Sequence, residues 1–337
     1  MRTRLRSLTD LGPWMTALGR LARRVWRIGR WVLAILVLAT LWGAGLEPRL
    51  VDSQHIVAPV PNLPPEWDGR TVALIADLQV GMWLANLDTI RRIIRELVET
   101  RPAAVLIASD FVYEPTEEAG EPAEAREELE AEDLRAADQQ IALAVSLIRP
   151  LVEAGIPTYA VPGNHDYAMQ WPDSLPLPSV TDRLETALAA AGIPLLRNDA
   201  LPMKTTAAES RPLYLVGLDA EYPKRANAAE ALAQLPPGAS RVVLMHNPAS
   251  FLDLPPGSAP LALAAHTHGG QIRIPFVPNW SWIRIVQDQP TPADGWADRQ
   301  FGARGNRLYI NRGIGFSVIP VRLNCPPELT FVTLIRG

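Results

Sequence analysis

The sequence predicts an α/β sandwich, because short apolar runs alternate with segments of helical periodicity along most of its 337 residues. Buried strands of a parallel sheet are typically short runs of apolar residues, and a helix usually connects one parallel strand to the next. A second observation points the same way. Side chains able to bind metals follow several of these runs, as expected where the carboxyl ends of parallel strands meet at one edge of a sheet.

The first 30 residues form a basic segment. They carry eight arginines against one acid, Asp10. Their apolar residues recur at helical spacing, at Leu11, Trp14, Leu18, Leu21 and Val25. A basic amphipathic helix of this kind is typical of a membrane surface.

Residues 31–46, "WVLAILVLATLWGAGL", contain no charge and predict a transmembrane anchor or a signal segment. The run is slightly shorter than the ~17–25 residues of a spanning helix and slightly longer than the ~7–15 of a signal peptide. We favour the retained anchor because no clean cleavage site follows. Positive charge before the span would keep that end in the cytoplasm. We therefore expect a single-pass protein of the inner (cytoplasmic) membrane, with the rest of the chain on the outer or periplasmic side.

Residues 47–69 are rich in proline, and we expect a linker there. The expected catalytic domain covers 70–337. Its expected strands are 71–76, 103–108, 157–161, 213–217, 241–245, 261–265, 307–311 and 329–335. Its expected helices are 86–100, 138–153 and 226–235. An acidic, alanine-rich insertion at 114–138 predicts a solvated helix or flexible segment, with a lid over the site as the alternative.

Composition excludes some classes of function. The net charge is only −4, so nothing in the overall charge suggests nucleic acid as a partner. The single cysteine, Cys325, excludes an intramolecular disulfide and a cysteine-rich zinc cluster.

Side chains able to bind metals follow five of the expected strands. They are Asp77, Asp110, Asn164, His165, Asp166, His246, His266 and His268. Carboxylates, an amide and imidazoles without thiolates suit Mn²⁺, Fe or Zn²⁺. A carboxylate can also bridge two cations that lie ~3.5–4 Å apart. The sequence therefore predicts a metal site at this edge of the sheet.

The order and spacing of these motifs, over roughly residues 70–270, resemble the calcineurin-like metallophosphoesterases. The motifs are Asp77-x-x, Ser109-Asp110, Gly163-Asn164-His165-Asp166, His246 and His266-Thr267-His268. The ending "NRGIGFSVIPVRLNCPPELTFVTL" also resembles the YkuE-like branch, which is often membrane-associated. The resemblance implies a four-layer α/β/β/α sandwich with two divalent metal ions at the strand ends.

Carried over by position, the resemblance makes Asp110 the ligand that bridges both ions. Asp77 and His268 would hold the first ion, and the second would be held by Asn164, His246 and His266. Gln79 stands where the family usually has histidine, and its amide oxygen would be a weaker ligand of the first ion.

The resemblance gives His165 and Asp166 catalytic roles. His165 would face the phosphate, to stabilise developing charge or to donate a proton to the leaving oxygen. Asp166 would orient His165. We also expect His266 and His268 to lie in an extended segment, where residues two apart point to the same side.

The implied function is hydrolysis of a phosphomonoester or phosphodiester by a hydroxide that bridges the two metals. The substrate stays open between a lipid phosphoester and a UDP-linked acylated sugar pyrophosphate. A non-catalytic, membrane-tethered metal-binding domain is the alternative of a different class. Trp280 and Trp282, which follow the His268 loop, could pack in a β-hairpin or lie at a membrane interface beside a lipid substrate.

Overall fold

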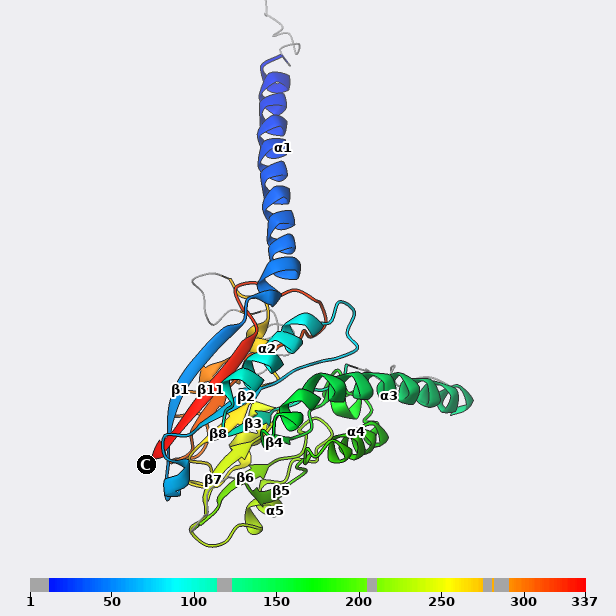
Figure 1. Ribbon diagram of the computed structural model, residues 1–337. Coiled ribbons are helices and arrows are strands. Elements are labelled where there is room, and N and C mark those ends of the chain that lie inside the picture. The colour runs from blue at the N-terminus through cyan, green and yellow to red at the C-terminus, as the bar shows by residue number, and fades with distance from the viewer. Residues whose placement is uncertain (1–11, 114–122, 205–210, 275–280, 282–290) are drawn as a thin grey trace, which may run out of the picture.

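The computed structural model describes residues 12–113, 123–204, 211–274, 281 and 291–337 (Figure 1). Two sheets form its centre. The five-stranded sheet has the order β1-β11-β2-β3-β4, and the six-stranded sheet has the order β5-β6-β7-β8-β10-β9. The strands of the first sheet are β1 (Asp52–Val60), β2 (Thr71–Ile75), β3 (Ala104–Ile107), β4 (Thr158–Ala160) and β11 (Glu328–Arg336). Those of the second are β5 (Asp199–Pro202), β6 (Leu213–Gly217), β7 (Ser240–Leu244), β8 (Ala262–Ala264), β9 (Gly295–Trp296) and β10 (Leu308–Ile310).

Three apolar cores separate four layers. One core joins the first sheet to helices α2 (Leu87–Thr100), α3 (Ala123–Glu153) and α4 (Pro178–Ala190). The second core lies between the sheets. The third joins the second sheet to α5 (Ala228–Ala233) and the short helix η5 (Pro248–Asp253). The expected four-layer α/β/β/α sandwich is confirmed.

Strand β2 shows how the sequence builds these layers. Its alternate residues face opposite sides, so Ala73 and Ile75 pack under the helices while Val72 and Leu74 pack between the sheets. Both faces are covered, which explains the uninterrupted apolar run.

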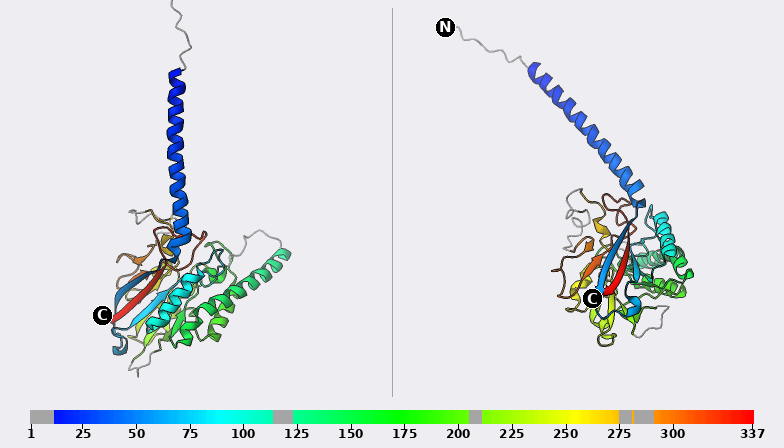
Figure 2. Two further views of the ribbon diagram at one scale, coloured as in Figure 1. Left: turned by 45° about the horizontal axis from the view of Figure 1, so that its top comes forward. Right: turned by 60° about the vertical axis from the view of Figure 1, so that its left-hand side comes forward.

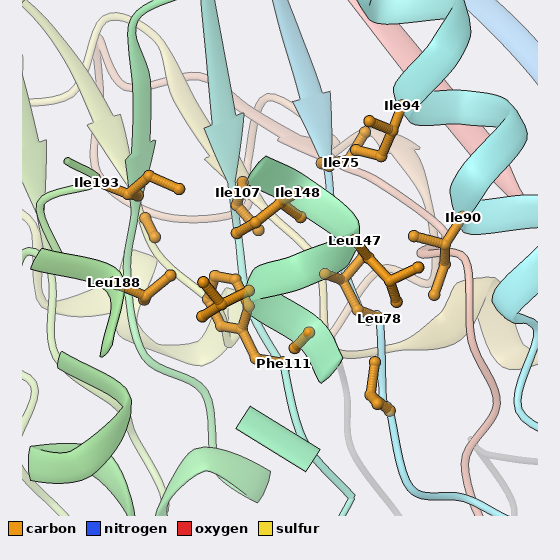
Figure 3. Packing of buried hydrophobic residues seen from close by; sticks show 14 of the residues in the cluster. Ile75, Leu78, Ile90, Ile94, Ile107, Phe111, Leu147, Ile148, Leu188 and Ile193 are labelled. Atoms are coloured by element: carbon orange, nitrogen blue, oxygen red, sulfur yellow. The ribbon is translucent and has the colours of Figure 1, made fainter. Parts of the chain in front are cut away.

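Helix α2 covers the first sheet with one apolar stripe. Its buried residues recur at helical spacing, at Ile90, Ile93, Ile94 and Leu97. Figure 3 shows Ile90 and Ile94 beside Leu147 and Ile148 of α3, over the sheet residues. Burial of such side chains stabilises the layer by about 1.5–3 kcal/mol each.

The strand β1 overturns the expected linker at 47–69. Asp52–Val60 pairs in parallel with Glu328–Arg336 over its whole length. The prolines predicted a linker, but Pro59 lies near the end of an edge strand, where its missing N–H costs no ladder hydrogen bond. The domain therefore begins before residue 70. Two further edge strands, β5 and β9, and the helix α4 were also missing from the expected elements.

The N-terminal helix is longer than expected. Helix α1 (Gly12–Leu41) crosses the expected boundary at residue 30 and continues into a short π-helix, η1 (Trp42–Leu46). No proline interrupts it between residue 14 and its end, so nothing breaks the helix there. Gly19–Arg49 is long and apolar enough to cross a membrane, and only 6% of its most apolar window is buried. Figure 2 shows α1 extending away from the sheets.

The acidic insertion does not form a separate element where the structure describes it. Residues 123–138 belong to the same helix, α3, as the expected helix 138–153. The remainder, 114–122, lies outside the described residues.

The strand directions place the base of α1 and the carboxyl end of β2 at the same end of the strands in the first sheet. Asp52, just after the anchor, pairs with Glu328, and β1 and β11 are parallel. Strand β2 runs antiparallel to β11, with Leu74 opposite Thr330. Chain leaving the end of β2 therefore emerges on the side of α1, as Figure 1 shows.

Candidate metal centre

Five strand ends bring the expected ligands together. Asp77 follows β2, Asp110 follows β3, Asn164 follows β4, His246 follows β7, and His266 and His268 follow β8. All of these side chains are buried. Asp77, Asp110 and His246 each offer a ligand atom within 4.8 Å of the others. The described residues therefore contain a compact group suited to a cation, as the sequence predicted.

The three residues expected to hold the second ion are Asn164, His246 and His266, and we call them the second-metal half. Hydrogen bonds orient each of these side chains. His246 Nδ1 donates to the carbonyl of Ala108 at 2.7 Å, which leaves Nε2 free as a ligand atom 3.2 Å from Asp110 Oδ2. His266 Nδ1 lies 3.2 Å from His246 Nε2, and its Nε2 lies 3.1 Å from the Tyr222 hydroxyl.

Asn164 is oriented in the same way. Its Nδ2 donates to the carbonyl of Met169 at 2.6 Å, while its Oδ1 is buried without a hydrogen-bond partner. A free amide oxygen in a buried cluster is a good ligand for a cation.

The three residues expected to hold the first ion are Asp77, Gln79 and His268, and we call them the first-metal half. Their side chains make few hydrogen bonds among the described residues. Both carboxylate oxygens of Asp77 and Oε1 of Gln79 are buried without partners. His268 Nε2 lies 3.9 Å from Asp77 Oδ1 and 3.2 Å from Gln79 Nε2. Burying an unpaired carboxylate is costly, so these orphaned acceptors fit a cation held between them.

Left-handed backbone conformations aim several of these side chains. Positive φ angles occur at Asp77 (51°), Gln79 (43°), Ser109 (57°), His266 (72°) and His268 (49°). Each costs about 1–3 kcal/mol for a residue with a side chain, and such strain concentrates at functional sites.

The expectation that His266–His268 form an extended segment is therefore wrong. The chain turns there, so that His266 approaches His246 while His268 approaches Asp77.

Two glycines leave room for the two aspartates. A Cβ on Gly163 would overlap Asp110 Oδ1, and a Cβ on Gly313 would overlap Asp77 Oδ2. Gly313 also has a φ of 66°, which favours glycine. Its neighbours hold the Asp77 loop, since Ile314 N donates to Ala76 O at 2.9 Å and Gly315 N to Asp77 O at 2.6 Å.

Asp166 does not orient His165, contrary to the expectation. Its carboxylate accepts hydrogen bonds from Ser109 Oγ, from Gly163 N at 3.0 Å and from Phe111 N at 2.9 Å. Backbone donors around the loop take up its oxygens, so none is left for the imidazole. Asp166 instead joins the loop after β3 to the loop after β4, and it thereby positions Asp110.

His165 lies beside Asp110, and its hydrogen bond to that carboxylate comes from the backbone rather than from the imidazole. Its backbone N–H donates to Asp110 Oδ1 at 3.0 Å. The imidazole stacks on Tyr113 with 4.9 Å between ring centroids, and its Nδ1 is buried without a hydrogen-bond partner. The ring is therefore held by packing against Tyr113, and its Nδ1 remains available to form a hydrogen bond.

Burial and neighbouring charges set the ionisation of the cluster. The pKa of Asp77 is raised to about 7, mainly by burial, with His246 lowering it and the Asp110 charge raising it. Burial also lowers the pKa of His266 to about 3 and moves the pKa of His268 well below its usual value. Both imidazoles are therefore neutral, which is the form that binds metal. Despite burial, His246 holds the pKa of Asp110 below its usual range. Against the effect of burial, the Asp110 charge in turn raises the pKa of His246 to about 9, so a bound cation would replace the proton on His246 Nε2.

The structure adds residues that the sequence analysis missed. Tyr222 contacts His266, and nothing in its sequence context marked it. Arg322 is fully buried, and its guanidinium donates to the carbonyl of Gly315 at 2.7 Å and reaches His268 O at 3.5 Å. It lies in the ending quoted for the family resemblance, which had no assigned role.

The base of the anchor packs on this same C-terminal segment. Glu47 accepts a hydrogen bond from Cys325 N at 2.5 Å and from Trp42 Nε1 at 2.6 Å. The backbone N–H of Arg322 donates to Gly43 O at 2.9 Å. The first-metal half is thus connected through Arg322 to the anchor. Trp280 and Trp282, considered for a membrane interface, lie outside the described residues.

Comparison with known proteins agrees with this geometry. The calcineurin-like phosphoesterase family matches residues 70–270. The chain is 22% identical over 291 residues to the uncharacterized metallophosphoesterase YkuE of Bacillus subtilis, covering 86% of this chain and 87% of YkuE. It is 37% identical over 195 residues to the phosphodiesterase YaeI of Escherichia coli, covering 56% of this chain and 62% of YaeI. It is 29% identical over 177 residues to the uncharacterized metallophosphoesterase YkoQ of Bacillus subtilis, covering 51% of this chain and 58% of YkoQ.

Proposed function

The chain belongs to the calcineurin-like phosphoesterase family and is a hydrolase of phosphate esters, and we propose that it is membrane-anchored and cleaves a lipid phosphoester. The observation that carries the proposal is the set of orphaned, buried acceptors at the strand ends, on the edge of the sheet where the anchor enters.

The residues present fit two divalent ions, Mn, Fe or Zn. Asp77, Gln79 and His268 would hold the first ion, and Asp110 would bridge to the second. Asn164, His246 and His266 would hold that second ion. Bound cations would supply Lewis-acid activation of water and neutralise charge on the phosphate.

The chain's own groups would do the rest. His165, packed on Tyr113, would donate a proton to the leaving oxygen or stabilise charge on the phosphate. Burial lowers the pKa of His165, so a proton that it receives is readily passed on. Asp166 would hold the two loops that fix the distance between His165 and Asp110.

Membrane anchoring is supported by α1. Its apolar window is almost wholly unburied by the rest of the chain, and arginines precede it. Positive charge before the span favours a cytoplasmic N-terminus, and the hydrolase domain would then lie on the outer side of the membrane. Activity of a reporter enzyme fused after residue 337 tests this orientation, and activity only in the cytoplasm contradicts it.

A lipid substrate is supported by the position of the centre. The carboxyl end of β2 and the base of α1 lie at the same end of the first sheet, so the centre would lie close to a bilayer that α1 spans. A phosphodiester is the preferred class because YaeI is named a phosphodiesterase. Release of uridine monophosphate, with the acylated sugar phosphate as the other product, would instead identify a UDP-linked acylated sugar as the substrate.

Two measurements test the function. The full chain in detergent, loaded with Mn²⁺, is expected to hydrolyse bis(p-nitrophenyl) phosphate, and the His165→Ala variant is the control. Incubation with total lipid extract, followed by phosphorus spectroscopy, is expected to show one lipid phosphorus species disappearing. A loaded protein that hydrolyses neither would be a metal-binding domain without catalysis.

A further inference from the structure

Large exposed apolar side chains are uncommon on the described part of the catalytic domain, and some of them gather near the anchor. Trp83 is 63% exposed and Leu84 is 69% exposed, in the loop between β2 and α2. Ile274, 42% exposed, lies beyond the loop after β8. Clustered exposed apolar residues mark an interaction surface rather than ordinary surface variation.

The Trp83–Leu84 loop begins at a metal ligand and ends at the anchor. Gln79 O accepts from Met82 N at 3.4 Å, and Met82 O accepts from Ala85 N at 2.9 Å, so Trp83 and Leu84 form the tip of a turn. Just after the tip, Asn86 Nδ2 donates to the carbonyl of Pro48 at 2.7 Å. The loop tip is therefore held close to the base of α1.

The Ile274 arm has the same arrangement. It follows the ligand His268 and runs beside the C-terminal segment, where Arg273 N donates to Leu323 O at 2.9 Å. The adjacent residue, Arg322, donates to Gly43 O at the base of α1. Two arms thus leave the first-metal half and carry apolar residues to the anchor.

Backbone strain at the tip supports a role for the side chain. Leu84 has a φ of 58°, a turn position that glycine or asparagine fits at lower cost. A branched apolar residue there is strained and 69% exposed, which points to a partner outside the chain.

We propose that Trp83, Leu84 and Ile274 form a bilayer-docking surface that holds the metal centre against the lipid headgroups. The occupant is the membrane because the surface is continuous with the anchor. At the anchor base, Trp42, Leu46 and Leu50 are also exposed. Tryptophan is favoured at the membrane interface, and an apolar tip would enter it by about 5–10 Å.

Positive charge around the anchor base fits the same occupant. The Arg92 guanidinium on α2 donates to Arg49 O at 2.6 Å, so two arginines lie together at the anchor base. Arginines close to anionic headgroups favour binding to the bilayer surface. The inference rests on the proposed membrane anchoring, but its test does not depend on catalysis.

The test labels the surface in the full chain, reconstituted in vesicles of phosphatidylcholine and phosphatidylglycerol. Leu84→Cys and, separately, Trp83→Cys are labelled with an environment-sensitive nitrobenzoxadiazole dye. Ile335→Cys is the matched control, an exposed aliphatic position at the far end of β11. Cys325 is fully buried, so the parent protein is expected to take up no dye.

At positions 83 and 84 we expect a blue shift of dye emission and quenching by more than about half with nitroxide-labelled acyl chains, because the tip reaches the acyl boundary. At position 335 we expect neither. If the dye at both loop positions behaves as it does at position 335, the docking surface is overturned.

Hydrolysis of bis(p-nitrophenyl) phosphate by the same samples reports on the proposed function separately. An active protein with an unquenched loop refutes only the docking, and an inactive protein with a quenched loop refutes only the catalysis.

Discussion

The two halves of the metal centre are held in different ways. In the second-metal half, carbonyl and hydroxyl partners within the catalytic domain fix each ligand. In the first-metal half, the acceptors of Asp77 and Gln79 have no hydrogen-bond partners, and the loop is braced by packing against the segment around Gly313 and Arg322. That segment also carries the anchor base. The affinity of the second-metal half for its ion should therefore depend on contacts within the catalytic domain. The affinity of the first-metal half should depend on the segment around Gly313 and Arg322 and on the anchor base that packs against it.

Removing the one ligand common to both halves should have the largest effect. Asp110→Ala is expected to lose both ions and essentially all hydrolysis, because the two cations would then repel each other without a shared carboxylate. Elemental analysis and the rate with bis(p-nitrophenyl) phosphate measure this. Retention of two ions per chain by the variant would show that Asp110 is not the bridge.

His165 separates catalysis from metal binding. His165→Ala should lower kcat by about 10²–10⁴-fold, the usual cost of a lost general acid, while the metal content stays unchanged. If proton donation is its role, the loss shrinks for p-nitrophenolate and grows for alkoxide leaving groups. An equal loss for both would favour charge stabilisation. A variant that loses its ions would place His165 among the ligands.

Two glycine substitutions compare the halves directly. Gly313→Ala would displace Asp77, and we expect it to remove only the first ion. Gly163→Ala would displace Asp110, and we expect it to weaken both ions. Metal content after equilibrium dialysis distinguishes the two results. Gly238→Ala is the control for a left-handed glycine, because it has a positive φ but open space around its Cβ position. Identical losses in Gly163→Ala and Gly313→Ala would mean that the halves are not separable.

Tyr222 tests whether hydrogen bonds really secure the second-metal half. Tyr222→Phe removes the hydroxyl near His266 Nε2 and should weaken the second ion by about 10–100-fold, as is usual for the partner of a histidine ligand. Calorimetric Mn²⁺ titration resolves the two binding steps. A change confined to the first step would reverse the assignment of the halves.

The smallest expected effect is a gain. Gln79→His replaces an amide with an imidazole, a better donor for transition metals, and should tighten the first ion while leaving the second unchanged. The same titration measures it. Unchanged affinity would indicate that Gln79 is not a ligand and that the Nε2 contact with His268 is its main role.

The ligand loops could be predicted from the sequence because the signal is local. Each lies directly after an apolar run, as Asp77 and His246 do, and the parallel sheet brings such ends together. The partners of those ligands were not predictable in this way. Tyr222 belongs to no motif, and Gly313 lies in the quoted C-terminal ending, to which no role was assigned. Only the folded chain places them beside His266 and Asp77.

The errors have physical causes as well. β1 was taken for a linker because Pro59 and the prolines that flank the strand obscure its pattern, while its pairing partner lies at the opposite end of the sequence. Asp166 was assigned to His165 because the two are adjacent in the chain. In the structure, backbone N–H groups of the neighbouring loop satisfy its carboxylate instead.

The position of β11 has a consequence for biogenesis. This strand lies between β1 and β2, although the ribosome makes it after every other strand described. Until it arrives, β1 has no neighbour and β2 lacks one, so the nascent chain exposes unpaired strand edges to other proteins. Closing the sheet brings together segments far apart in sequence, which makes folding slow. A chain stalled or truncated before residue 328 should therefore be a substrate for chaperones and proteases, and the first sheet should become protease-resistant only after β11 has been synthesised.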